Sequence, residues 1–206
     1  KTTPNKLSNV WSESLRKHHL SEETQCRLRK NLTPLRKSTG TRFGEGQKIP
    51  TMSDAAEPYL FDVGVIALAH TDAPVRESAL SYVREAIAGD IDAVVPYPAV
   101  FGAHTILTTY YGRSNADASR LLENFMDANR IHWYDEMPEA VVRGGLSQAR
   151  DANVGGWDGY YAQVAIDEGV NTVLTIDDDF DRFDAFDTEI ILSPTEFREL
   201  NSFLGS

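Results

Sequence analysis

The sequence has only one cysteine, Cys26, and no long run of apolar residues. A single cysteine excludes an internal disulfide framework. A membrane-spanning helix needs about 20 predominantly apolar residues, and because no such stretch occurs, none is predicted. No charged-then-apolar segment of the signal-peptide type is present either. We therefore expect a soluble, cytoplasmic protein that does not act at a membrane.

Lysine is absent after Lys48, and the later part of the chain is strongly acidic. Residues 52–206 contain 9 Arg, no Lys and 27 Asp or Glu, a net charge of −18. Because Lys is normally among the commonest residues, this absence needs an explanation. An acidic surface without lysine suits a cytoplasm of very high salt, where screening weakens self-repulsion. We therefore expect a salt-adapted (halophilic) source, and equal stability from low to molar KCl would contradict this hypothesis.

Residues 1–51 have a different composition, with 11 Lys or Arg against 4 Asp or Glu, a net charge of +7. The stretch 32–50 mixes Gly, Pro, Thr and Lys without a period, which is typical of a disordered or linker segment. The composition changes abruptly at Met52. Two interpretations remain open: a non-native extension upstream of a start at Met52, or a basic arm that binds a polyanion. Residues 52–206 are predicted to form one folded domain.

Short apolar segments alternate with helical patterns from residue 58 onward. The predicted strands are 59–61, 93–95, 131–134, 172–176 and 189–192. The predicted helices are 75–87, 100–111, 117–128, 138–149, 158–168 and 194–203. Strands separated by helices predict an α/β fold with a mainly parallel sheet that is covered on both faces.

Four aspartates lie where such a sheet would gather them. Asp62 ends the first predicted strand, Asp177 and Asp179 follow the fourth, and Asp158 opens a helix. In open α/β sheets, ligands bind beyond the carboxyl ends of the strands. Carboxylates within about 4–6 Å of one another repel, and a divalent cation removes that penalty. Mg²⁺ and Mn²⁺ prefer oxygen ligands, so these residues predict a site for one of these ions.

Each aspartate also has an interpretation without a metal. Asp62 and Asp158 are each suited to cap the helix that follows them. Asp177 to Asp179 are equally typical of a solvated turn. Unrelated caps and turns need not lie at one edge of the sheet, however, and this favours the joint interpretation.

Several enzyme classes are excluded by residues that the chain lacks. A receiver domain needs a Lys, and the later chain has none. A haloacid-dehalogenase-type phosphotransferase needs a second Asp two residues after the first, where Gly64 stands. The pair Gly155-Gly156 follows no strand, so a glycine-rich phosphate loop is not predicted.

Three segments together resemble the PIN domain, the nuclease fold of the VapC-type toxins. They are LFDVGVI at 60–66, GGWDGYYA at 155–162 and LTIDDDF at 174–180. The resemblance implies a three-layer α/β/α fold and Mg²⁺- or Mn²⁺-dependent hydrolysis of single-stranded RNA. It further implies that Asp62, Asp158 and Asp177 hold the metal, that Asp179 assists, and that Thr175 supports the site. Many members are toxins silenced by an antitoxin protein, and many form homodimers.

The sequence departs from this family in the helix after the second strand, where a Glu is usual. Gly102 or Ala103 stands there, and no Asp or Glu occurs between Asp92 and Asp117. His104 is a doubtful substitute, because it falls on a different face of the helix. The alternative function is therefore a catalytically silent module of the same fold that binds RNA or protein. The candidate arginines for contacts with the RNA backbone are Arg113, Arg120 and Arg150.

Overall fold

The structure is a computed structural model, and it describes residues 58–205. The predicted extension at residues 1–51, with both of its interpretations, lies outside the described residues.

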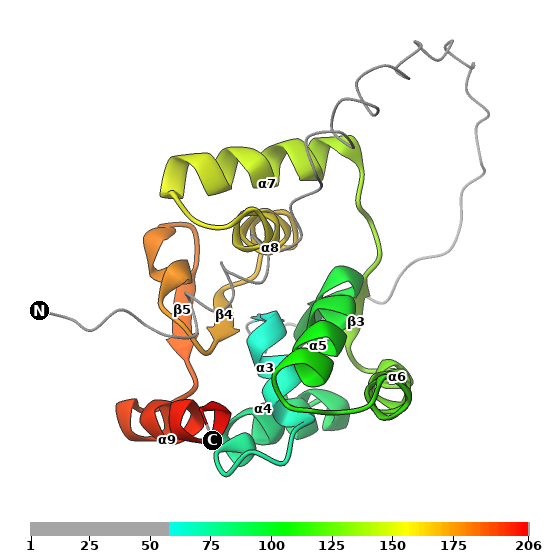
Figure 1. The fold of residues 1–206 in the computed structure, drawn as a ribbon. Coiled ribbons are helices and arrows are strands. Elements are labelled where there is room, and N and C mark those ends of the chain that lie inside the picture. The colour runs from blue at the N-terminus through cyan, green and yellow to red at the C-terminus, as the bar shows by residue number, and fades with distance from the viewer. Residues whose placement is uncertain (1–57, 206) are drawn as a thin grey trace, which may run out of the picture. The chain divides into compact units, whose positions relative to one another are not determined.

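A five-stranded, entirely parallel sheet forms the centre of the described part of the chain (Figure 1). Its strands lie in the order β3-β2-β1-β4-β5. Their bounds are β1 Tyr59–Phe61, β2 Ala93–Pro96, β3 His132–Tyr134, β4 Thr172–Thr175 and β5 Asp187–Ile190. The predicted α/β class with a mainly parallel sheet is confirmed.

Helices link these strands and cover the sheet in a three-layer α/β/α arrangement. In Figure 1, α7 and α8 lie together at one side of the view, apart from α4, α6 and α9. The helices are α3 Val63–Ala69, α4 Arg76–Ala88, α5 Tyr97–Thr109, α6 Asn115–Met126, α7 Glu139–Ala152, α8 Gly156–Asp167 and α9 Pro194–Leu204, with a 3₁₀ turn η1 at Asp179–Arg182.

Hydrophobic residues of the central strands form the core. Leu60 and Phe61 of β1 and Val173 and Leu174 of β4 are fully buried, as parallel strands covered on both faces require. Helix α3 is buried along its whole length, and so its apolar sequence has no polar face. The core therefore surrounds β1, the strand that ends at Asp62.

Two details of the predicted elements were wrong. Helix α5 begins at Tyr97, not at 100, because Pro98 fits the first turn of a helix, where its missing N–H is not needed. Strand β5 covers Asp187–Ile190 instead of 189–192, and it pairs in register with Thr172–Thr175. Ile87 continues the i, i+4 apolar spacing of Val75, Ala79 and Val83, yet it is 45% exposed.

Helices α7 and α8 approach each other closely at glycines. A Cβ atom on Gly145 would lie 2.8 Å from Cα of Tyr160. A Cβ atom on Gly159 would meet the carbonyl of Gly145 and lie 2.6 Å from the backbone nitrogen of Ala149. The two helices thus touch backbone to backbone, directly beside Asp158.

Candidate metal centre

The site lies where the strand order of the sheet reverses direction. The chain runs from β1 outward to β2 and β3, then returns to β4 on the other side of β1 and continues to β5. In open α/β sheets, such a switch point, at the carboxyl ends of the strands, is where ligands bind. The carboxyl ends of β1 and β4 meet there.

Asp62 and Thr175 lie side by side at this switch point. Phe61 is in register with Leu174, so the next residue of each strand reaches the same level. The backbone N–H of Asp62 donates to the carbonyl of Leu174 (3.0 Å), and Oγ1 of Thr175 donates to Oδ2 of Asp62 (3.1 Å). Asp62 also caps α3, because its Oδ1 accepts from the N–H of Val63 (2.7 Å). Both Asp62 and Thr175 are buried.

Asp177 joins Asp62 through the same threonine. Oγ1 of Thr175 lies 3.5 Å from Oδ1 of Asp177, and it accepts from the backbone N–H of Asp177 (3.3 Å). The backbone N–H of Asp179 donates to Oδ1 of Asp177 (3.3 Å), so the turn after β4 is folded around this carboxylate. The predicted supporting role of Thr175 is consistent with these contacts.

Asp158 comes to the site from the start of α8. Its Oδ2 accepts from the backbone N–H of Gly155 (3.1 Å), so this aspartate also caps its own helix. Gly155 leaves room for that contact, because a Cβ there would lie 2.6 Å from the same oxygen. The capping interpretation is thus confirmed for Asp62 and Asp158, and it does not remove either carboxylate from the site.

The carboxylates are close enough to raise one another's pKa. Burial, and then the charges of Asp177 and Asp158, raise the pKa of Asp62 well above its usual value. Burial and the charges of Asp177 and Asp179 raise the pKa of Asp158 to about 7, although Arg182 opposes this. Burial is also the main cause that raises the pKa of Asp177 to about 6. The four predicted aspartates therefore form one electrostatic cluster.

The donor set of this cluster fits a hard divalent cation. Its atoms are carboxylate oxygens and a hydroxyl, which suit Mg²⁺ or Mn²⁺ and not a soft metal. Within residues 58–205, no group of three or more His, Cys, Asp or Glu side chains is arranged to hold a metal ion. Mg²⁺ typically keeps several waters and binds through one or two carboxylates, so an open set of ligands is compatible with it.

The raised pKa values predict that acidic pH stabilises the metal-free domain. The folded state holds protons that the unfolded chain releases above about pH 4, so this contribution to stability is lost as the pH rises through about 6 to 7. In EDTA we expect the melting temperature to be about 5 °C higher at pH 5 than at pH 8. Thermal unfolding followed by circular dichroism measures this difference. The Asp158→Asn variant should show a smaller difference in melting temperature between pH 5 and pH 8. An equal difference in both proteins would contradict the prediction.

The glycines at positions 64 and 102 are both packed closely against apolar side chains. A Cβ on Gly102 would lie 2.9 Å from Cγ2 of Val63, so α5 is packed against the start of α3 at this point. A Cβ on Gly64 would lie 2.6 Å from Cγ1 of Ile176. His104 lies against α6, with its Nε2 3.3 Å from Oγ of Ser119. His104 is therefore engaged away from the four aspartates and does not replace the missing Glu.

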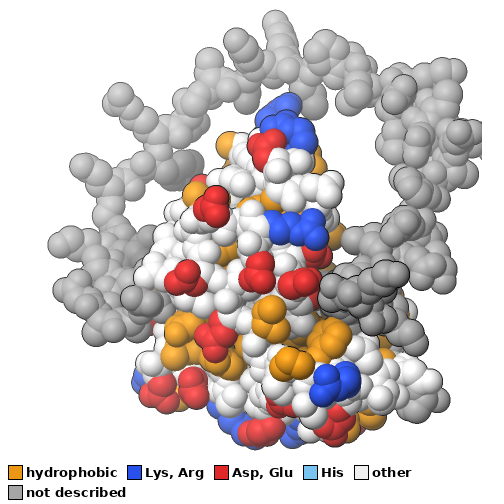
Figure 2. Space-filling view, turned by 90° about the vertical axis from the view of Figure 1, so that its left-hand side faces the viewer, with side chains coloured by type: hydrophobic (Ala, Val, Ile, Leu, Met, Phe, Trp, Pro, Cys, Tyr) orange, Lys and Arg blue, Asp and Glu red, His pale blue; other side chains and the backbone are white. Residues whose placement is uncertain are grey.

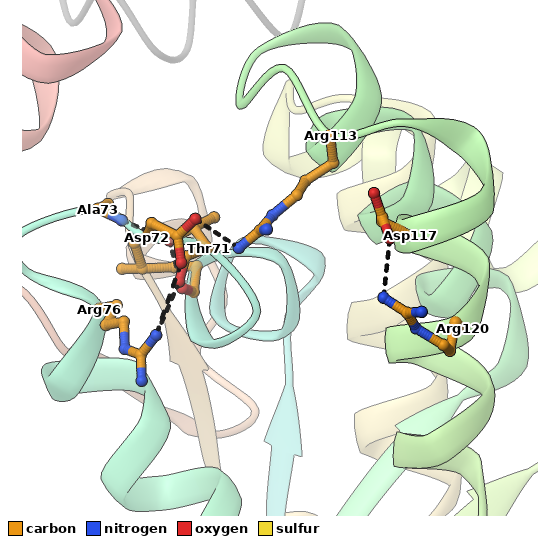
Figure 3. Close-up of polar contacts among 8 residues, drawn as sticks. Thr71, Asp72, Ala73, Arg76, Arg113, Asp117 and Arg120 are labelled. Carbon is orange, nitrogen blue, oxygen red and sulfur yellow. Dashed lines mark hydrogen bonds and ion pairs between the residues drawn. The ribbon is translucent and has the colours of Figure 1, made fainter.

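The arginines predicted to contact RNA are engaged in ion pairs. Arg113 pairs with Asp72 (2.7 Å), and Arg76 lies 3.9 Å from the same carboxylate (Figure 3). Arg120 pairs with Asp117 (2.8 Å). Arg150 pairs with the adjacent Asp151 (2.8 Å). On the face drawn in Figure 2, acidic side chains are more prominent than basic ones.

Two residues near the cluster were missed by sequence reasoning. Arg182 of η1 lies 3.3 Å from Asp179, donates to the carbonyl of Asn153 (2.8 Å) and lowers the pKa of Asp158. Its spacing of three residues from Asp179 was a usable signal, but only if a helical turn had been predicted there. Trp157 precedes Asp158 and is 43% exposed. No sequence signal distinguishes such an exposed aromatic from a core residue.

Comparisons with known proteins find similar folds among solved structures. No family model matches the chain, and no curated protein matches it. VapBC2 from Rickettsia felis, solved bound to a DNA fragment from its promoter, has a TM-score of 0.50 at 14% identity, covering 64% of this chain and 97% of that one. VapC20 from Mycobacterium tuberculosis, a sarcin–ricin loop cleaving toxin, has a TM-score of 0.48 at 12% identity, covering 60% and 92%. FitAcB from Neisseria gonorrhoeae has a TM-score of 0.44 at 20% identity, covering 63% of this chain and 95% of that one.

At these identities the likeness concerns the fold alone. The five-stranded parallel sheet and its flanking helices match a PIN-like fold, as the three sequence segments predicted. No helix of the described residues is both long and apolar enough to cross a membrane. The described part of this chain is a PIN-like α/β/α domain.

Proposed function

We propose that this domain is a metal-dependent endoribonuclease that hydrolyses phosphodiester bonds in single-stranded RNA. The observation that carries the proposal is the meeting of Asp62 and Asp177 at the switch point, joined by the hydroxyl of Thr175. Asp158 adds a third carboxylate from a distant segment, and all three have raised pKa values. Burying several like charges is unfavourable, and a cation is the simplest way to offset them.

The residues of the chain divide the work of such a site. Asp62, Asp158 and Asp177 would hold a Mg²⁺ or Mn²⁺ ion, and Asp179 would assist from the adjoining turn. When bound, the ion would lower the pKa of a water molecule and offset the charge of the phosphate. Thr175 fixes the directions of the Asp62 and Asp177 carboxylates, while the cap contacts of Asp62 and Asp158 restrain both side chains. These contacts limit how far the Asp62 and Asp158 side chains can rotate.

Cleavage and metal binding test the proposal together. The wild-type protein should cleave single-stranded RNA with Mn²⁺ or Mg²⁺ in high KCl and not in EDTA. The same ions should raise its melting temperature in the absence of RNA. Cleavage that is undiminished by EDTA would overturn the metal-dependent site.

Arg182 is the arginine whose charge reaches the carboxylates, and we expect it to contact a phosphate of the RNA. Its pair with Asp179 lies at the surface, so exchange for a phosphate costs little. In the Arg182→Gln variant, the slope of log K for RNA binding against log[KCl] should be less negative by about 0.7. This is the value for one phosphate contact on a single strand. Fluorescence anisotropy of a labelled RNA at several KCl concentrations measures this slope.

Arg120→Gln is the matched control. Arg120 is also exposed and ion-paired, but it lies on α6, a helix that contributes no carboxylate to the cluster. An equal change in both variants would contradict the assignment.

We further propose that the domain is the toxin of a toxin–antitoxin pair and that it forms a homodimer. The PIN-like fold supports this, because VapC-type toxins share it. A small gene that overlaps or lies upstream of this one would supply the antitoxin. Expression of the domain alone should arrest growth, and co-expression of that gene should restore it. Light scattering of the purified protein gives the oligomeric state.

The second candidate is a catalytically silent module that binds RNA or protein. The tight contact between Gly102 and Val63 favours it, because an acidic side chain at position 102 would require the two helices to shift. The two functions differ in a simple result. Absence of cleavage together with absence of a metal-induced rise in melting temperature would support the silent module.

A further inference from the structure

Trp157 presents a large aromatic surface to solvent while its ring is held in place. The residue is 43% exposed, and its indole stacks on Tyr161, with ring centroids 6.2 Å apart and planes 25° apart. The edge of Tyr160 supports it as well, at 6.0 Å and 87°. Because neighbouring rings fix its orientation, a partner that stacks on Trp157 would not have to pay for ordering the side chain.

This ring lies beside the carboxylate cluster. Trp157 directly precedes Asp158, and Tyr161 follows one helical turn later on the same face of α8. Tyr161 is buried, so the ring on which the indole stacks belongs to the core of the domain. The chain before the indole is Gly155-Gly156, and a Cβ on Gly156 would meet no atom within 4 Å. Open space thus lies beside Gly156, the residue that precedes Trp157.

The electrostatics of the domain make an uncharged contact important. The described residues include nine arginines and no lysine, against 25 aspartates and glutamates. Seven of these arginines are in ion pairs with carboxylates. The other two, Arg130 and Arg198, donate to Ala88 and Thr195. In such an acidic domain, phosphate contacts like the one proposed for Arg182 supply only a small part of the affinity for RNA.

We propose that Trp157 is a stacking surface for one base of the RNA, next to the phosphate that is cleaved; this inference rests on the proposed ribonuclease function. Single-stranded RNA is commonly bound by stacking its bases on aromatic side chains, and such stacking tolerates any base. Salt does not screen it as it screens phosphate contacts. By contrast, Trp133 stacks on Tyr97 and donates its indole N–H to the carbonyl of Ala128 (3.1 Å), so that ring is occupied within the fold.

Binding of a labelled single-stranded RNA tests the stacking surface. The Asp177→Asn background slows cleavage at least about 100-fold, and molar KCl suppresses phosphate contacts. Trp157→Leu should weaken the Kd roughly 5- to 100-fold, the range for loss of one stacked base. Trp157→Tyr should stay within about threefold of the parent, because a tyrosine ring also stacks. The control is Phe203→Ala on α9, a ring of similar exposure (39%) on a helix without a cluster aspartate, and it should leave Kd unchanged.

A substrate lacking one base identifies the position that Trp157 contacts. Oligonucleotides with a single abasic nucleotide at each site around the mapped cleavage point are bound to the parent and to the Trp157→Leu variant. At one position the two losses should not add, because both changes remove the same stacked pair. Additive losses at every position would overturn the inference.

The outcomes separate this inference from the proposed function. If wild type cleaves RNA while Trp157→Leu keeps the parent's Kd and kcat/KM, the stacking surface is refuted and the ribonuclease stands. If RNA is never cleaved but its binding depends on Trp157 at one base, the stacking surface stands and the ribonuclease falls. A change of oligomeric state in Trp157→Leu with unchanged RNA binding would assign the ring to a protein interface instead, and would also refute the inference.

Discussion

The Asp62→Asn and Asp177→Asn variants should each cleave RNA at least about 100-fold more slowly than wild type. Loss of a partner that merely orients a metal ligand typically costs 10- to 100-fold in affinity or activity, so loss of a ligand itself should cost more. Asparagine preserves the shape of the side chain, and it is a good N-cap, so Asp62→Asn should keep the start of α3. The rate of cleavage under saturating Mn²⁺ measures the effect.

The same variants should be more stable than wild type when no metal is present. Each removes one charge from a buried cluster in which like charges raise the pKa of Asp62 and Asp158. We expect a gain on the order of 1–2 kcal/mol, or about 5 °C in melting temperature in EDTA. Mn²⁺ should then stabilise the variants less than it stabilises wild type. Opposite changes in stability and activity are typical of residues kept for function and not for folding.

Asp178→Asn is the matched control, because Asp178 belongs to the same turn but its side chain is exposed. It changes the same charge one residue away from Asp177 and should retain cleavage within about twofold of wild type, as surface substitutions usually do. If Asp178→Asn and Asp177→Asn lost activity equally, the effect would come from the net charge of the turn. That result would contradict the assignment of Asp177 as a ligand.

Gly159→Ala should destabilise the domain by about 3 kcal/mol or more, even though alanine favours helices by about 1 kcal/mol over glycine. The new Cβ would meet the carbonyl of Gly145 and would lie 2.6 Å from the nitrogen of Ala149. These are backbone atoms of α7, which cannot rotate away, so the two helices would have to separate. Urea unfolding followed by circular dichroism measures the free energy of unfolding. Since Asp158 directly precedes Gly159, cleavage should fall as well.

Gly144→Ala provides the control on the facing helix. The three atoms nearest to its new Cβ all belong to the side chain of Gln163, a flexible group that can move aside. This variant should be neutral or up to about 1 kcal/mol more stable, through the helix preference of alanine. Similar losses in Gly144→Ala and Gly159→Ala would mean that the close approach of the two backbones is not what limits substitution.

The sequence by itself determined the order of strands and helices and the candidate aspartates. Apolar segments such as Tyr59–Phe61 and Thr172–Thr175 are short, local signals, and their alternation with helices predicts a parallel sheet. Asp62, Asp158 and Asp177 were recognisable because each follows a strand or opens a helix. The resemblance of three segments to the PIN domain predicted the three-layer fold that the structure has.

Only the tertiary structure decided how these residues interact. The hydrogen bond from Thr175 to Asp62 depends on the register of β1 against β4, which no local pattern encodes. The engagement of Arg113 by Asp72 and the contact of Gly102 with Val63 join segments that lie far apart in the chain. Sequence periodicity reports which side of one element faces inward, whereas the identity of the partner across the core is a long-range property. The aspartates could be proposed from the chain alone because each stands at the end of a strand or the start of a helix. Arg182, Trp157 and Gly159 could not, because their neighbours are set by long-range packing.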